Sequence, residues 1–288
     1  MRGVAVAMSV PLYVRLLPRR LVSRTLGFLA RRRVPRWLLQ RVLRAYCRGF
    51  GVDLSEAAAP LESYRTFDAF FTRPLRDGLR PLDPDPAAFL SPVDARVYMS
   101  GPVEAGTILQ AKGVPYTLAD LLGSADDAAP FDGGTFVTAY LSPKDYHRIH
   151  WPLTGAVEHI RHLPGDLWPV NDRALAGVRG LFARNERIAI LGRTSSGAAF
   201  AMVPVGALNV GSIGLEFHDV RTNRPFRRAP RTIPFAPPVA ATRGDRAAWF
   251  SFGSAVVLLL SPGAGRLDAL EPGTLLRVGR RMGTLTLR

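Results

Sequence analysis

The sequence is poor in cysteine and in long apolar runs, and each shortage excludes a class of protein. Its 288 residues contain one cysteine, Cys47, which excludes a disulfide framework and a zinc or iron–sulfur site built from cysteines. No apolar run reaches the roughly 18 residues that a membrane-spanning helix needs. Apolar residues still make up 47% of the chain and charged residues 21%, so the sequence is that of a folded protein and not of a disordered one.

Acidic residues are missing from the N-terminal part of the chain. Residues 1–48 contain twelve arginines and no carboxylate, and Asp53 is the first acidic residue. Subtracting these twelve from the 38 basic residues leaves 26 basic and 23 acidic residues for 49–288, a net charge of only +3 out of the total of +15. The positive charge therefore lies in one N-terminal arm. Such an arm can meet nucleic-acid phosphates or anionic lipid headgroups, and charge alone does not choose between them.

The pattern of the arm predicts short amphipathic helices interrupted by Pro11, Pro18 and Pro35. Over residues 37–50 the apolar side chains recur at three- and four-residue steps while the arginines fall on another face, and residues 12–29 repeat this arrangement. Basic helices that carry Trp, Phe and Leu opposite arginine are typical of a membrane interface. The alternative is a helical cap on the body whose arginines are merely solvated. We expect the arm to associate with a membrane surface.

The texture of the sequence changes after a polar, proline-rich segment, residues 53–88. Short β-type runs bounded by Gly and Pro follow, and helical patterns become few. The runs that predict strands are 135–141, 188–191, 199–205 and 255–260, and those that predict helices are 118–122 and 171–176. We therefore expect an α+β fold, in which a helical basic region, residues 1–62, precedes a mostly β catalytic body, residues 63–288.

Four of the five histidines form two pairs with i, i+3 spacing, His147 with His150 and His159 with His162. Such a pair chelates a metal when it lies on a helix. Here Trp151-Pro152 follows the first pair, and no carboxylate cluster supplies the remaining ligands. We predict no metal site.

One Gly-Ser pair, Gly253-Ser254, lies between an aromatic, strand-like stretch and the strongly β-forming run 255–260. Because glycine has no Cβ, the next hydroxyl can approach its carbonyl at low steric cost, as an N→O acyl shift requires. The alternative is a glycine bend that enters a buried strand. The pair alone does not decide between them.

A series of motifs extends along the chain in a characteristic order. They are Tyr64-Arg65-Thr66-Phe67, Phe70-Phe71-Thr72-Arg73-Pro74-Leu75, Ser91-Pro92-Val93-Asp94, Tyr140-Leu141-Ser142-Pro143-Lys144-Asp145-Tyr146-His147-Arg148-Ile149-His150, Pro164-Gly165-Asp166-Leu167 and Phe252-Gly253-Ser254. With these motifs the chain resembles the bacterial, pyruvoyl-dependent phosphatidylserine decarboxylases over nearly its whole length. Two positions depart from the family pattern, since Ala255 replaces the common threonine and Ala95 the common glycine. Both lie beside the reactive groups and do not replace them.

The resemblance implies a proenzyme that cuts itself. Ser254 would attack the Gly253 carbonyl, with His150 as the base and Asp94 orienting its imidazole. The products would be a β chain, residues 1–253, and an α chain, residues 254–288, whose Ser254 becomes a covalent pyruvoyl group, the cofactor. This carbonyl would form a Schiff base with phosphatidylserine and accept the electron pair as carbon dioxide leaves, which yields phosphatidylethanolamine. His147, expected to titrate near the working pH, is the candidate for protonating the carbanion.

The resemblance also implies partners and a location. The partners are an anionic phospholipid membrane, the phosphatidylserine substrate, and the α and β chains of one proenzyme. No nucleic acid is expected, and a homo-oligomer is compatible with the sequence. The location is the cytoplasmic face of the cell membrane, as a peripheral protein. Two alternatives remain, namely a pyruvoyl decarboxylase of another amine, such as a soluble amino acid, and a non-catalytic, basic membrane-binding homologue.

Overall fold

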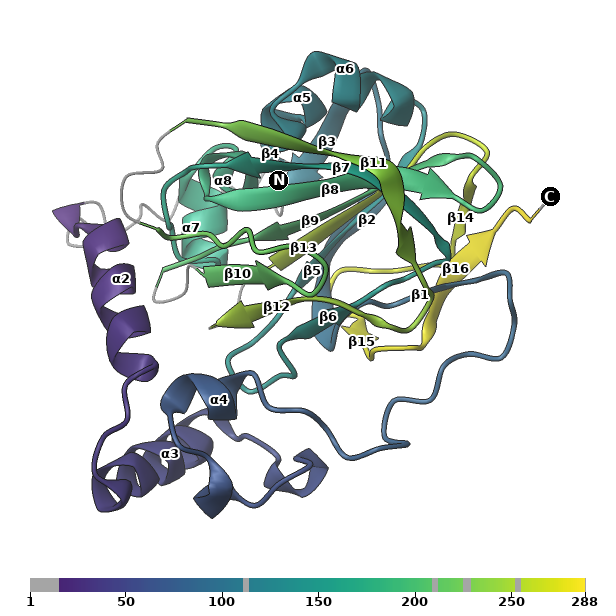
Figure 1. Cartoon of the computed structure of the whole chain (residues 1–288). Helices are drawn as coiled ribbons and strands as arrows, with labels where there is room; N and C mark the ends of the chain where they lie inside the picture. The colour runs from purple at the N-terminus through teal and green to yellow at the C-terminus, as the bar shows by residue number, and fades with distance from the viewer. Residues whose placement is uncertain (1–15, 111–113, 209–211, 225–228, 252–254, 288) are drawn as a thin grey trace, which may run out of the picture.

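A group of helices lies beside a mostly β body in the computed structural model (Figure 1), and the expected α+β class is confirmed. The structure describes residues 16–110, 114–208, 212–224, 229–251 and 255–287. The helices are α2 (Arg19–Ala30), α3 (Arg36–Phe50), α4 (Phe67–Phe71), α5 (Leu118–Leu122), α6 (Ala125–Ala128), α7 (Asp172–Gly177) and α8 (Leu181–Arg184). No helix within these ranges has the length and apolarity needed to cross a bilayer.

Prolines and a glycine set the limits of the two long helices. Helix α2 begins directly after Pro18 and α3 directly after Pro35, as the sequence predicts. Proline suits this place because its ring fixes φ and because the first N–H groups of a helix have no intrahelical partner. Helix α3 ends at Gly51, whose φ of 69° lies in the left-handed region that favours glycine.

Helix α3 packs through one apolar face onto the segment that contains α4. Leu39, Leu43 and Cys47, one turn apart from each other, are buried there together with Tyr64 and Phe70. This small core joins residues on both sides of position 62, so the helical layer continues into α4. The division into residues 1–62 and 63–288 stays a prediction.

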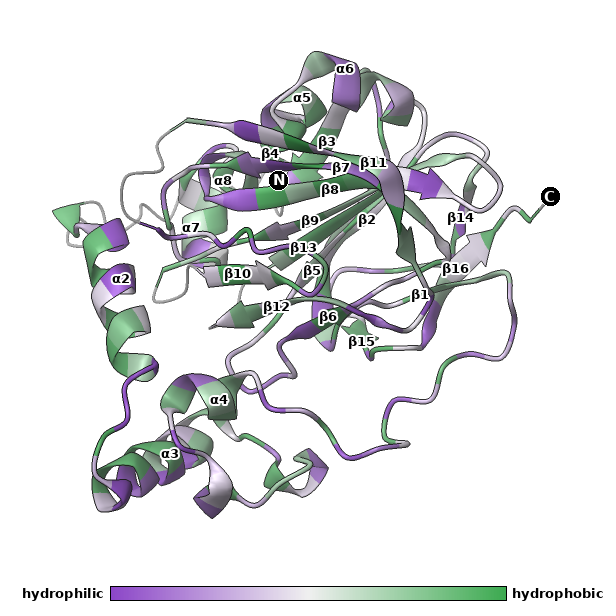
Figure 2. Ribbon diagram, in the orientation of Figure 1, coloured by the Kyte–Doolittle hydropathy of each residue, from purple (hydrophilic) through white to green (hydrophobic). Residues whose placement is uncertain are grey.

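The largest sheet of the described residues has eight strands with antiparallel pairing. Their spatial order is β11 (Arg231–Ala241), β7 (Gly155–Leu163), β8 (Arg187–Thr194), β9 (Ala199–Val205), β13 (Ala255–Leu260), β5 (Thr135–Tyr140), β2 (Ala95–Pro102) and β15 (Leu275–Leu276). The four strands expected from the sequence are among them. Figure 2 shows apolar residues along the central strands and alternating apolar and polar residues on α2 and α3.

Strand β13 occupies the interior of this sheet and is buried on both faces. It pairs with β5 on one side and with β9 on the other. Val256, Leu258 and Leu260 point into one core, and Val257 and Leu259 into the core on the opposite face. This alternation follows from the period of two along a strand. A continuous apolar run is therefore what this position requires.

Layers cover both faces of the large sheet. Helices α5 and α8 belong to one core, through Leu121 and Phe182 among others. The other core includes Ile149, Ile213 and Phe250 from a three-stranded sheet of β10 (Ser212–Leu215), β12 (Arg246–Ser251) and β6 (Arg148–His150). The remaining strands are β1 (Ala88–Leu90), β16 (Arg281–Leu285) and β14 (Gly265–Leu267), which form a sheet, and the pair β3 (Thr107–Gln110) and β4 (Val114–Thr117).

Candidate active site

The predicted cleavage residues lie between two buried strand ends. Ser251 ends β12 and Ala255 begins β13, and both are buried. Gly253 and Ser254 themselves lie outside the described residues. In the sequence, each is within two residues of a described strand end. The other predicted site residues are described.

His147 is a buried, neutral imidazole close to the end of β12. Its carbonyl accepts the N–H of Phe250 at 3.0 Å, and its ring packs against that of Phe71 with centroids 4.1 Å apart. Neither ring nitrogen has a hydrogen-bond partner of normal geometry among the described residues. Burial, and then the charge of Arg73, lower the pKa of His147 to about 3, against a weaker opposing effect of the Asp145 backbone.

This value differs from the expectation that His147 titrates near neutral pH. The sequence shows an ordinary histidine in a polar motif, whereas the fold places the ring in the core at 0% exposure. Removing the imidazolium from water disfavours the charged form. At neutral pH the ring is therefore uncharged.

His150, on β6, is held with a defined tautomer. Its Nδ1 lies 2.7 Å from the carbonyl oxygen of Gly244, and because a carbonyl only accepts, Nδ1 carries the hydrogen. Nε2 therefore has the lone pair, which accepts the hydroxyl of Tyr146 at 3.1 Å. Burial is the main cause that lowers the pKa of His150, and the bond to Gly244 opposes it. The side chain is thus a neutral base with Nε2 as its proton acceptor.

Asp94 is buried close to His150 but does not contact its ring. The carboxylate accepts hydrogen bonds from Arg80 Nε at 3.0 Å, from Arg277 Nη1 at 3.2 Å and from the backbone N–H of Val278 at 2.9 Å. The His150 N–H donates at 2.9 Å to the carbonyl of Pro92, two residues before Asp94. At a distance, the negative charge of Asp94 adds a small upward contribution to the pKa of His150.

Arg80 links Asp94 to a second carboxylate, that of Glu56, at 2.7 Å. Burial alone would lower the pKa of Arg80, but its hydrogen bonds to Asp94 and Glu56 raise it above the ordinary value. Arg277 also reaches Glu56, at 3.3 Å. Asp94 is thus the centre of a cluster of two carboxylates and two guanidinium groups.

Three side chains near the site were not predicted, namely Tyr146, Arg80 and Arg73. Arg73 is 3% exposed, donates from Nη2 to the Lys144 carbonyl at 3.3 Å and lies 5.0 Å above the ring of Phe70. Its Nε and Nη1 have no partner among the described residues, and burial lowers its pKa. Tyr146 and Arg73 could have been suspected because they belong to the motifs quoted above, but a motif does not show which atoms are in contact.

The second histidine pair lies elsewhere, on β7. His159 faces Asp127 at 3.3 Å, and His162 bonds to Glu186 at 2.9 Å in the core. Each has a carboxylate partner of its own. We therefore place neither in the candidate site.

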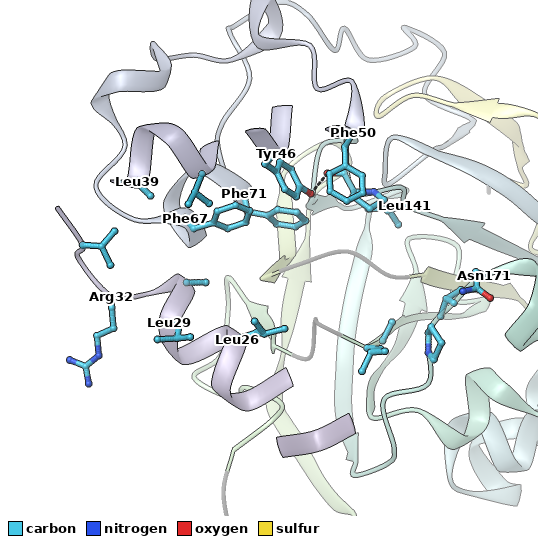
Figure 3. A pocket seen from close by; sticks show the side chains of 18 of the residues that line it. Leu26, Leu29, Arg32, Leu39, Tyr46, Phe50, Phe67, Phe71, Leu141 and Asn171 are labelled. Atoms are coloured by element: carbon cyan, nitrogen blue, oxygen red, sulfur yellow. Dashed lines mark hydrogen bonds between the residues drawn. The ribbon is translucent and has the colours of Figure 1, made fainter. Parts of the chain in front are cut away.

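An apolar cavity of about 740 Å³ separates α2 and α3 from the body (Figure 3). Leu26 and Leu29 of α2, Phe67 and Phe71 of α4, and Leu141 of the body line it. At its edge the hydroxyl of Tyr46 on α3 donates to the carbonyl of Pro143 at 2.7 Å. Since Phe71 also touches His147, the cavity extends to one side chain from the buried imidazole.

Comparisons with known proteins identify the family of the chain. The sequence profile of the family described as phosphatidylserine decarboxylase matches residues 67–284. A phosphatidylserine decarboxylase proenzyme of Anaeromyxobacter sp. (strain K) is 47% identical over 274 residues, which cover 94% of this chain and 96% of the relative. The proenzyme of the same name from Myxococcus xanthus (strain DK1622) is 38% identical over 95% of this chain and 97% of its own. The chain belongs to the phosphatidylserine decarboxylase family.

Proposed function

We propose that this chain is a phosphatidylserine decarboxylase proenzyme, which cuts itself before Ser254 and then converts phosphatidylserine to phosphatidylethanolamine. The observation that carries the proposal is the buried, neutral imidazole of His147, whose carbonyl accepts the N–H of Phe250 one residue before the strand end at Ser251. His150, also neutral, follows three residues later at the end of β6. Family membership supplies the reaction class. The apolar cavity next to His147 supplies room for a lipid.

Self-cleavage needs a base for the Ser254 hydroxyl. His150 suits this role because its tautomer leaves the Nε2 lone pair free to accept a proton. That lone pair holds the Tyr146 hydroxyl, whose pKa is raised by burial so that it stays protonated. We therefore assign Tyr146 the relay of the proton from Ser254 to His150. Asp94 acts at a distance, through its charge and through the backbone link between Pro92 and His150.

A small carbonyl group at position 254 fits the surroundings, because the buried His147 ring has two nitrogens with no partner among the described residues. A pyruvoyl group there would supply an electrophilic carbonyl that binds the substrate amine and accepts the electrons released with carbon dioxide. His147 holds or moves the proton at the reacting carbon. Although its ring is neutral in the structure, an anionic substrate beside it raises the pKa, because a nearby negative charge favours the imidazolium.

The cleaved chains would remain one molecule. Strand β13 opens the future α chain and lies between β5 and β9, which both belong to the future β chain. Arg277 and Val278 of the α chain also hold Asp94 of the β chain. Cleavage before Ser254 breaks one peptide bond and leaves these contacts in place.

Membrane docking is supported by the surface of the helical arm. Ten of the fifteen large apolar side chains that are exposed among the described residues come from residues 16–50, Trp37 at 65% and Phe28 at 50% among them. Exposed arginines at positions 33, 36 and 41 lie in the same region. Apolar side chains beside cations suit the headgroup boundary of an anionic bilayer. We propose a peripheral position on the cytoplasmic face of the cell membrane.

Denaturing mass spectrometry and a vesicle assay test the proposal. The wild type should give two fragments, 1–253 and 254–288, and release carbon dioxide from phosphatidylserine vesicles but not from soluble serine. His150→Ala should remain a single chain, and Tyr146→Phe should cut more slowly. His147→Ala should cut but decarboxylate poorly. An intact wild-type chain that is fully active would refute the mechanism, and activity on soluble serine would favour the other-amine alternative.

A further inference from the structure

A second cavity, of about 490 Å³, lies on another side of α2 and has the opposite character. Four arginines line it, Arg24 and Arg31 from α2 and its end, and Arg221 and Arg224 from the segment after β10. Serine, threonine and asparagine side chains make up much of the remaining wall, and no Asp or Glu is among the described residues that line it. A cavity with several guanidinium groups and no carboxylate has the chemistry of an oxyanion site.

Among the described residues, none of these four arginines forms an ion pair with a carboxylate. Arg24 donates from Nη2 to the backbone carbonyl of Arg224 at 3.1 Å, while its buried Nε has no partner among the described residues. Arg221 lies over the ring of Trp249, 5.1 Å from its centroid. Glu186 accepts the backbone N–H of Asn223, also a lining residue, at 3.0 Å, but Glu186 is itself paired with His162. Among the described residues that line it, the cavity thus holds four guanidinium groups and no carboxylate.

Backbone geometry also marks this wall. Asn223 has a φ of 58°, in the left-handed region that few residues other than glycine adopt. Its side-chain oxygen is buried with no partner among the described residues. Asparagine is enriched in that region, and its unpartnered oxygen can accept a hydrogen bond from a donor of a bound molecule.

The cavity lies within reach of the candidate active site. Ser251, one of its lining residues, is three positions before Ser254, and three residues of chain span at most about 10 Å. In phosphatidylserine only a few covalent bonds separate the amine from the phosphodiester. An amine that reacts at position 254 therefore brings its phosphate to the neighbourhood of this cavity.

Helix α2 separates the two cavities. Leu26, Leu29 and Ala30 line the apolar one, whereas Arg24 and Arg31 line the basic one. At 100° per residue, these two sets lie on opposite faces of the helix. The apolar and the anionic parts of one lipid molecule would thus meet different faces of the same helix.

We propose that the arginine-lined cavity is the subsite for the phosphodiester of the lipid headgroup. This inference rests on the proposed function, since it takes its substrate from there. The arginines donate charge-assisted hydrogen bonds to the two unesterified oxygens of the phosphate. In this way they place the amine of the same headgroup at position 254.

A binding measurement that needs no chemistry tests the subsite. The probe is glycerophosphoglycerol, which carries a phosphodiester but no amine, titrated calorimetrically into the full-length wild type. Arg221→Gln, Arg31→Gln and Arg24→Gln should each weaken its binding on the order of tenfold, the loss expected for a charge-assisted hydrogen bond. The matched control is Arg266→Gln, an exposed arginine on β14 outside both cavities, which should bind as the wild type does. Circular dichroism checks folding, and Arg221 and Arg31, both exposed, decide the outcome if Arg24→Gln fails to fold.

Kinetic measurements in neutral-detergent micelles provide the second test. For phosphatidylserine, the same variants should raise KM about tenfold and leave kcat within about twofold. Wild-type binding and KM values in Arg221→Gln and Arg31→Gln would overturn the subsite while leaving the decarboxylase proposal intact. A wild type that binds the probe through these arginines but does not decarboxylate phosphatidylserine would refute the proposed function instead. Equal or tighter binding of inorganic phosphate, with unchanged KM values, would assign the cavity to a free anion and overturn the headgroup assignment.

Discussion

Replacing Asp94 by asparagine tests the cluster at the junction of the two future chains. Asparagine keeps the shape of the side chain and an oxygen that can accept the Val278 N–H, but it removes the negative charge from between Arg80 and Arg277. Removing one partner of a buried ion pair costs about 3–5 kcal/mol, because the other charge is left uncompensated. Arg80 retains Glu56, and Arg277 is 56% exposed, so we expect the lower end, about 3 kcal/mol.

The measurement is urea unfolding of the uncut proenzyme. Both proteins carry Ser254→Ala, so that each is a single chain and the comparison is between like species. The matched control is Asp268→Asn, which removes an exposed carboxylate that pairs with Arg281 at 3.2 Å. A surface pair of this kind contributes about 0–1 kcal/mol. If Asp94→Asn lowers the free energy of unfolding no more than Asp268→Asn does, our account of the cluster is wrong.

The same substitution in the cleavable chain separates stability from chemistry. We expect Asp94→Asn to slow self-cleavage, since its charge acts on His150, and Arg277→Gln to leave the rate closer to that of the wild type. The fraction of cut chain against time, read from denaturing gels, measures both. Equal slowing by the two variants would show that the cluster acts on cleavage only through the fold.

Three further predictions follow from the buried histidine, the central strand and the basic arm. The free energy of unfolding should fall as the pH drops below about 6.5, because His147 then binds a proton in the unfolded chain but not in the folded chain until about pH 3. His147→Gln should reduce this dependence of stability on pH in urea titrations, and an unchanged dependence would contradict the low pKa. After cleavage, the two fragments should elute together in native gel filtration and separate only in denaturant, because burial of the large aliphatic side chains of β13 alone contributes about 10 kcal/mol of stabilising free energy. Separation of the fragments in native buffer would contradict this. The triple variant Arg33→Gln, Arg36→Gln and Arg41→Gln should bind anionic vesicles more than tenfold less tightly at low salt, since each cation contributes about 1 kcal/mol, and should bind neutral vesicles as weakly as the wild type does. Equal binding of the variant and the wild type to anionic vesicles would exclude these arginines as the electrostatic anchor.

The strands and helices could be predicted because each depends on local chemistry. The run 255–260 has no polar residue and is rich in β-branched and other apolar side chains, which suits a strand buried on both faces, as β13 is. Proline at positions 18 and 35 sets where α2 and α3 begin. Such signals act within a few residues of the chain, so a single sequence contains them.

The contacts of the site depend on residues far apart in the sequence, and there prediction fell short. Nothing near Asp94 in the sequence shows that Arg277, 183 positions later, holds its carboxylate. Likewise the pKa of His147 depends on burial by Phe71 and on the charge of Arg73, both from another segment. The residue types were predicted, but their partners required the fold.

For the basic arm, the sequence left two alternatives, a cap on the body and a membrane-associating surface, and different arginines match each of them. Arg19 pairs with Asp166 and stacks on Trp168 at 3.6 Å, and Arg20 donates to the Gly165 carbonyl, so the start of α2 is a cap fastened to the body. The arginines between α2 and α3 are instead exposed beside apolar side chains, as a membrane-facing surface requires. The charge pattern predicted the arm but not which arginines contact the body, because that depends on the residues that the fold places next to each arginine.

The position of α2 connects docking to catalysis in physical terms. The helix is fixed at its start through Arg19 and lines both the apolar and the basic cavity with its later turns. Exposed Phe28 and Leu29 lie on those same turns, so a bilayer that receives them also acts on the walls of both cavities. We therefore expect removal of α2 to abolish the proposed membrane docking and the proposed substrate binding together.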